Sequence, residues 1–194
     1  SSAASDVYKR QVYALVAAID AKDSFTFQHS TNVSQYAVLL AQKLGLSRND
    51  IQTVKVAGLL HDIGKIGIPE SILKKAGKLT NEEYEIMKSH VEKSIEMIHY
   101  LPNMNYVIPA VVSHHERYDG KGYPRGIKGE EIPFLGRILA VCDSFDAMIS
   151  KRAYKEPLSV EYAMGELEKN KGTQFDPEVA DAFIELIKEG KVPL

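Results

Sequence analysis

The segment from residue 134 to residue 150 constrains the fold of this chain more than any other. It reads FLGRILAVCDSFDAMIS, which is apolar enough to form a buried helix. Asp143 and Asp146 lie inside it, one helical turn apart, and should share a face. Because a lone buried carboxylate is costly, the fold must bring a positive partner to this helix, and a metal cation would serve.

The rest of the chain also has helical patterning. Apolar residues recur at helical spacing over 12–19 and 33–44, and Gly45 ends the second of these runs. Strand signals are nearly absent, so we predict an all-α, single helical-bundle domain with one or two long functional loops. Capping signals predict further helices starting at Ser47, running from Thr80 through His90 and running from Asp176 to Gly190. We expect one more helix over about 105–117, which delivers His114 and His115.

Composition narrows the class of protein. A chain of 194 residues is long enough for one domain with a full core. A net charge of -2 gives no general attraction to a nucleic-acid polymer or a membrane. The single cysteine, Cys142, excludes an internal disulfide and fits a cytoplasmic protein. Residues 1–11 have no apolar period, so we treat them as a non-native or linker segment and assign the domain to residues 12–190.

The histidines point to function. Adjacent ionisable residues occur as His61-Asp62 in HDIGK and as His114-His115 in HHERYDGKGYP. Neighbouring groups of this kind at a buried helix end need strong partners, and a metal ion is such a partner. Five of the six histidines fall at these or related positions, whereas nothing around His99 suggests a site. The pattern predicts metal-dependent hydrolysis of a phosphodiester.

These motifs resemble the HD-GYP family, the cyclic di-GMP phosphodiesterases within the HD phosphohydrolase superfamily. The resemblance covers about residues 20–187 and includes HDIGKIGIPESIL, EEYEIMKSH, HHERYDGKGYPRGIKGEEIP, RILAVCDSFDAM and GTQFDP, in the expected order. HD by itself is a weak signal. HHExxDGxGYP followed by the downstream aspartate is highly specific.

The resemblance implies a binuclear site for two divalent ions, most readily iron or manganese, with Asp62 bridging them. Seven residues would be ligands by motif position: His29, His61, Asp62, His90, His114, His115 and Asp143. Taken alone, His29 and His90 would pass for ordinary core histidines. Some family members bind a third metal through a glutamate at the position of Phe25, so we expect two metals here, with Asp23 wrongly spaced to substitute. Val91 and Ser94 also depart from the usual proline and glycine.

The resemblance further implies catalytic and substrate-binding roles. Asp62 and Lys65 are the catalytic candidates, with Lys65 facing a phosphate oxygen or positioning the nucleophile. The expected substrate contacts are Gly122, Tyr123, Pro124, Asp146, Arg152 and Lys155. For Asp146 the alternative is to orient a ligand. For Glu116 and Asp119, tying down the loop is as plausible as catalysis.

Three functions remain open at this point. The first is hydrolysis of cyclic di-GMP to linear pGpG, with GMP left open as a further product. The second keeps the metal site but acts on another cyclic dinucleotide or on a nucleoside phosphate. The third is a sensor that binds a cyclic dinucleotide without turnover. The complete ligand set favours the enzyme. We also expect control by a sensory or receiver domain. The sequence leaves two roles open for the first helix, about 7–20, which are to transmit a signal as a connector or to form a homodimer.

Overall fold

The computed structural model describes residues 12, 14–17, 26–151 and 156–194 of the chain. Regular structure in those ranges is helical, and their one β-bridge is an isolated pair between Lys171 and Phe175. The prediction of an all-α fold is confirmed. None of the described helices is both long enough and apolar enough to cross a lipid bilayer.

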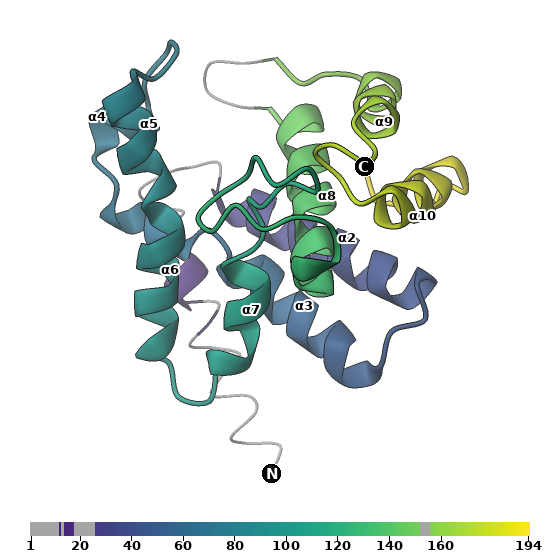
Figure 1. Cartoon of the computed structure of the whole chain (residues 1–194), viewed down its shortest axis with the longest axis horizontal. Coiled ribbons are helices and arrows are strands. Elements are labelled where there is room, and N and C mark those ends of the chain that lie inside the picture. The colour runs from purple at the N-terminus through teal and green to yellow at the C-terminus, as the bar shows by residue number, and fades with distance from the viewer. Residues whose placement is uncertain (1–11, 13, 18–25, 152–155) are drawn as a thin grey trace.

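Figure 1 shows the arrangement of the helices. The α4, α5 and α6 helices lie on one side, α9 and α10 lie on the other, and α8 stands between them. The α-helices are α2 (Thr26–Lys43), α3 (Arg48–Leu60), α4 (Glu70–Leu73), α5 (Asn81–Lys88), α6 (His90–His99), α7 (Ile108–Val111), α8 (Phe134–Ile149), α9 (Val160–Lys169) and α10 (Pro177–Lys188). Short 3-10 helices are η1 (Ile63–Gly67), η2 (Asn105–Val107) and η3 (Gly129–Glu131).

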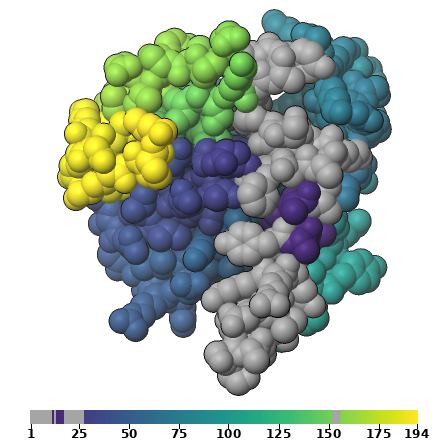
Figure 2. Space-filling model, turned by 180° about the vertical axis from the view of Figure 1, so that it is seen from behind, coloured from purple at the N-terminus to yellow at the C-terminus, as the bar shows by residue number. Residues whose placement is uncertain are grey.

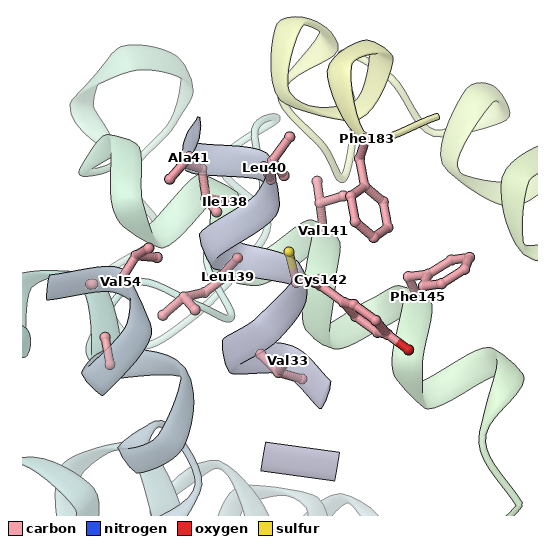
Figure 3. Packing of buried hydrophobic residues seen from close by; sticks show 14 of the residues in the cluster. Val33, Leu40, Ala41, Val54, Ile138, Leu139, Val141, Cys142, Phe145 and Phe183 are labelled. Carbon is pink, nitrogen blue, oxygen red and sulfur yellow. The ribbon is translucent and has the colours of Figure 1, made fainter. Parts of the chain in front are cut away.

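The core forms where α2, α3, α8 and α10 meet. Figure 3 shows their buried apolar side chains interleaved around α8. The rings of Tyr36 and Phe183 pack against Phe145, with centroid distances of 5.8 and 5.1 Å. On the opposite face of the molecule, the end of the chain lies beside α2 (Figure 2), and the Tyr36 hydroxyl donates to the Pro193 carbonyl at 3.1 Å. This packing holds α2, α3 and α8 in fixed positions.

The predicted helix starts are confirmed by their caps. Ser47 Oγ accepts the Asp50 amide at 3.1 Å, and Thr80 forms a reciprocal capping box with Glu83. Asp176 Oδ1 accepts the Glu178 amide at 2.9 Å, so α10 also begins where the sequence indicates. These caps satisfy backbone amides that have no partner within the helix.

Two helices are shorter in the structure than predicted from the sequence. The helix from Thr80 does not run through His90, because α5 ends at Lys88 and α6 begins at His90. The helix expected over about 105–117 ends at Val111, which leaves His114 and His115 in the turn that follows. In both places Nδ1 of a histidine donates to the backbone carbonyl three residues earlier in the chain. Such local hydrogen bonds compete with the backbone hydrogen bonds that would continue the helix.

Candidate metal centre

Seven ionisable side chains from across the fold converge at one place. One group consists of Asp62, His90, His114 and His115, and the other of His29, His61 and Asp143. Within each group the potential ligand atoms lie within 4.8 Å of one another. These are the seven residues expected from the sequence. The helices α2 and α8 supply one each, the end of α3 and the turn after it supply two, α6 supplies one, and the turn after α7 supplies two.

Three of the histidines are held in the same way. In His61, His90 and His114, Nδ1 faces a backbone carbonyl three residues earlier in the chain. The acceptors are the carbonyls of Gly58, Met87 and Val111, at 2.8, 2.6 and 2.6 Å. Because a carbonyl only accepts, Nδ1 must carry the proton, and Nε2 presents a lone pair. This is the tautomer that a metal requires of an Nε2 ligand.

The inward-facing atoms of this cluster lack hydrogen-bond partners. Among the described residues, Nε2 of His61, Nε2 of His90, Nε2 of His114 and Oδ1 of Asp62 are buried and have none. Buried polar atoms without a partner are costly and rare in native proteins. Four of them at one point, all able to donate a lone pair, fit a divalent cation.

Asp62 lies between the two groups. Its Oδ1 is 3.3 Å from His90 Nε2, whereas its Oδ2 is 3.4 Å from His61 Nε2 and 3.8 Å from His29 Nε2. One carboxylate oxygen therefore faces each group, which is the geometry that a bridging ligand needs. The Lys65 ammonium lies 2.5 Å from Oδ2 and one quarter of its side chain is exposed.

Asp146 makes hydrogen bonds with His29 and Asn32. The carboxylate is fully buried, with Oδ2 2.7 Å from His29 Nδ1 and Oδ1 accepting from Asn32 Nδ2 at 2.8 Å. Both oxygens are thus engaged by the protein, and the structure supports the orienting role rather than the contact with a base. A carboxylate that binds the far nitrogen of a histidine orients the ring and makes its other nitrogen a better ligand. Nothing in the sequence motifs singled out Asn32.

The electrostatics of the cluster suit a cation. Burial lowers the pKa of His61, and burial with the neighbouring His115 lowers the pKa of His114 well below its usual value. Burial also lowers the pKa of His115 to about 4. Burial alone would raise the pKa of Asp62, but Lys65 and His61 hold it well below the ordinary range. At neutral pH His61, His114 and His115 are thus neutral imidazoles and Asp62 is an ionised carboxylate, the protonation states that bind metal.

His29 differs from the other histidines. Burial disfavours its charged form, yet hydrogen bonds to Asp143 and Asp146 outweigh burial and raise the pKa of His29 to about 9. The contact with Asp143 is 3.1 Å from Nε2, and the same pair holds the pKa of the Asp143 carboxyl below its usual range despite burial. A metal bound at His29 would therefore displace a proton.

The loop that follows His115 is tied down by its own acidic residues. Glu116 accepts the Arg125 amide at 2.8 Å, and Asp119 accepts the Lys121 amide at 3.1 Å while pairing with Arg117. Both residues therefore have the structural role that the sequence left open. The loop is also anchored to the segment around residue 173, whose carbonyl accepts the Asp119 amide at 2.8 Å.

Gly122 and Tyr123 place this loop against the cluster. A side chain at Gly122 would meet the Arg117 nitrogen at 2.3 Å, so the close approach that this glycine permits is to the protein's own backbone. The Tyr123 ring stacks on His115 at 4.8 Å with an interplanar angle of 25°. Pro124, which follows, is exposed.

The expected substrate contacts Arg152 and Lys155 lie outside the described residues, as do Phe25 and Asp23.

Ser94, which stands where the HD-GYP family usually has glycine, makes two hydrogen bonds that a glycine could not make. Its buried hydroxyl accepts the Gly64 amide at 2.8 Å and lies 3.1 Å from the His61 carbonyl, to which it donates. It thereby fastens the HDIGK turn to α6, and α6 continues unbroken through Ser94 and the buried Val91. His99, as expected, lies outside the cluster and contacts Asn105 Oδ1 at 3.1 Å.

Comparison with known proteins shows the family of this chain. The model of the HD domain family matches residues 14–179. A cyclic di-GMP phosphodiesterase of Thermotoga maritima is 44% identical over 170 residues, which are 87% of this chain and 46% of that protein. The cyclic di-GMP phosphodiesterase response regulator RpfG of Xanthomonas campestris is 42% identical over 172 residues, 88% of this chain and 46% of that protein. A 3'3'-cGAMP-specific phosphodiesterase of Vibrio cholerae is 39% identical over 179 residues, 91% of this chain and 34% of that protein.

Solved structures share the fold. A cyclic GMP-AMP-specific phosphodiesterase of Vibrio cholerae superposes with a TM-score of 0.74 at 18% identity, covering 93% of this chain and 49% of that one. The HD domain of the phosphodiesterase PgpH of L. monocytogenes superposes with a TM-score of 0.62 at 20% identity, covering 90% of this chain and 97% of that one. The chain belongs to the HD domain family, and the predicted HD-GYP membership is confirmed. It spans less than half the length of the curated relatives described above.

Proposed function

We propose that this domain hydrolyses cyclic di-GMP to linear pGpG, from which a second cleavage would give GMP. The observation that carries the proposal is the convergence of seven ligand-type residues around buried, partnerless Nε2 and carboxylate atoms. The curated relatives named cyclic di-GMP phosphodiesterases support the choice of substrate. The complete cluster argues against a sensor that binds without turnover.

The ligand set suits two divalent ions, and imidazole with carboxylate favours iron or manganese. When bound, such ions polarise a phosphodiester and make hydroxide available near neutral pH. Asp62 would be shared between them, because its two oxygens face the two groups of ligands. His29, His61 and Asp143 would complete one side, and His90, His114 and His115 the other.

The remaining residues would serve the phosphodiester and its bases. Lys65 holds a positive charge beside Asp62 and is partly exposed, so it can face a non-bridging oxygen of the phosphate. Tyr123 and Pro124 would border a base. Arg152 and Lys155 would contribute charge-assisted bonds to the phosphates, as the motif predicts.

A second candidate substrate is a mixed cyclic dinucleotide, because the relatives include 3'3'-cGAMP-specific phosphodiesterases of Vibrio cholerae. The test uses the domain reconstituted with iron(II) or manganese in the absence of oxygen. Turnover of cyclic di-GMP and of 3'3'-cGAMP is measured, and the products are separated by chromatography. We expect pGpG to form before GMP and cyclic di-GMP to be the preferred substrate. Preference for 3'3'-cGAMP would establish the second candidate. Binding of cyclic di-GMP without turnover would establish a sensor.

The number of metals is a separate test. Because Phe25 stands where some relatives have a ligating glutamate, elemental analysis should give two metals per chain. Phe25→Glu should permit a third. A third metal bound by the unaltered chain would contradict the prediction.

Control by a sensory or receiver domain, self-association and a cytoplasmic location remain expectations from the sequence. A response-regulator relative supports the first of them. Sedimentation of the purified domain, with and without cyclic di-GMP, would measure self-association.

A further inference from the structure

The α5 helix carries two side chains, within the EEYEIMKSH segment, to which the sequence analysis assigned no role. Tyr84 and Lys88 lie one turn apart and therefore on the same face. The α5 helix buries none of its residues, and Tyr84 is 48% exposed. An apolar core therefore does not explain why an aromatic ring stands there.

Both side chains face the loop that contains Tyr123. The rings of Tyr84 and Tyr123 meet edge to face, at a centroid distance of 6.3 Å and an angle of 81°. The Lys88 ammonium lies 5.3 Å from the centre of the Tyr84 ring and 5.7 Å from that of Tyr123. It also pairs with Glu85 at 2.6 Å. An ammonium has three hydrogens, so this pair leaves donors for another acceptor.

Ring contacts connect this face to the metal centre. Tyr123 stacks on His115 at 4.8 Å, and His115 in turn contacts His90 at 5.1 Å. The rings form a continuous series from the cluster to α5, whose outermost member is the exposed Tyr84. A molecule whose phosphodiester lies at the cluster would therefore have an aromatic surface with a cation beside it.

We propose that Tyr84 and Lys88 of α5, together with Tyr123, bind a guanine base of the cyclic dinucleotide. This inference rests on the proposed function and names the surface that recognises its substrate. Tyr84 stacks with the base, because every nucleobase offers a π-face to an aromatic side chain. Lys88 donates to the O6 and N7 acceptors of guanine, whereas adenine has an amino donor in place of O6. Tyr84 thus contributes affinity, and Lys88 contributes discrimination.

The first test replaces Tyr84. Tyr84→Ala should raise KM for cyclic di-GMP about tenfold, the loss expected for one stacked base, with kcat and metal content unchanged. Tyr84→Phe keeps the ring and should remain close to the unaltered domain. Tyr106→Ala is the matched control, because Tyr106 has the same exposed fraction and lies on η2, away from this surface. An unchanged KM in Tyr84→Ala, or equal losses in Tyr84→Ala and Tyr106→Ala, would overturn the inference.

The second test replaces Lys88. Lys88→Gln should lower the preference for cyclic di-GMP over cyclic di-AMP by about tenfold in kcat/KM, as expected for a lost contact to a base edge. Glu85→Gln removes the surface ion pair but keeps the ammonium, so its preference should stay the same. A preference that is unchanged in Lys88→Gln would remove Lys88 from the proposed contact with guanine.

The third test does not need turnover. A cyclic dinucleotide that carries 2-aminopurine loses fluorescence when its base stacks on an aromatic ring. We expect quenching by the metal-loaded domain and by Tyr84→Phe, but little by Tyr84→Ala. If cyclic di-GMP is not hydrolysed yet this difference is seen, the base surface stands and the proposed function fails. Equal quenching by the unaltered domain and Tyr84→Ala would overturn the base surface whether or not turnover occurs.

Discussion

The metal centre and the face of α5 lie side by side but are built on opposite principles. Five of the seven ligand candidates at the centre are buried, and His115 and Asp143 are partly buried. Nδ1 of His29, His61, His90 and His114 is held by a specific acceptor. On α5, Tyr84 is exposed and Lys88 is partly exposed; both contact the ring of Tyr123, and Lys88 also pairs with Glu85. Burial makes each replacement at the centre costly, whereas exposure lets the face of α5 change with little cost to the fold. We therefore expect chemistry to depend on the first region and choice of base on the second.

The largest expected effect is that of Asp62→Ala. Losing the carboxylate that lies between the two groups should weaken binding of both metals and abolish turnover, because a two-metal site depends on its shared ligand. Elemental analysis and turnover of cyclic di-GMP measure the two effects. If both metals and full activity survived, the centre would not be organised around Asp62.

The next effect tests how tightly the centre is packed. Gly64→Ala would place a carbon 2.0 Å from the His90 carbonyl oxygen, so the HDIGK turn must move away from α6. We expect an unfolding free energy lower by about 1–3 kcal/mol, together with weaker metal binding. Gly77→Ala is the control, because nothing lies within 4 Å of the added carbon. Denaturant unfolding of both variants should show a loss for Gly64→Ala alone.

Asp146→Asn tests a residue at the metal centre that supports the ligand candidate His29. It keeps the shape of the side chain but replaces the carboxylate that holds His29 Nδ1 at 2.7 Å. Metal affinity or activity should fall roughly 10–100-fold, the usual cost of removing such a partner. Asn32→Ala leaves the carboxylate in place and should cost less. Titration with manganese measures the affinities, and equal losses would show that Asp146 acts through packing alone.

Arg152→Ala belongs to the substrate side of the comparison. The motif assigns Arg152 a charge-assisted bond to phosphate, so its loss should raise KM by about one to two orders of magnitude. Metal content should not change. If Arg152→Ala lowered metal content instead, its assignment to the substrate would be wrong.

The ligand candidates could be named because the chain resembles the HD-GYP family, and six of the seven lie in short motifs, His29 being the exception. Helix starts were predictable because a cap such as Thr80 with Glu83 lies within one turn. Helix ends near His90 and Val111 were not. There the imidazole bonds to Met87 and Val111 carbonyls compete with the helix, and no apolar period records that competition.

Residues that act through contacts between distant segments were beyond sequence patterns. Asp146 could orient a ligand or meet a base until the fold brought both of its oxygens to His29 and Asn32, more than one hundred positions away. The sequence assigned no role to Tyr84 and Lys88, because only the fold places α5 beside Tyr123.

Periodicity and capping are properties of neighbouring residues, so the amino-acid sequence was enough to predict the helical class. The family and its metal-ligand candidates came from the resemblance of short motifs to the HD-GYP family. The folded arrangement was needed to show which imidazole nitrogen faces inward, which carboxylate lies between the two groups and which exposed ring stands beside the loop. Those features depend on the relative positions of α2, α3, α5, α6 and α8, and these positions follow from packing around a shared core rather than from any local signal.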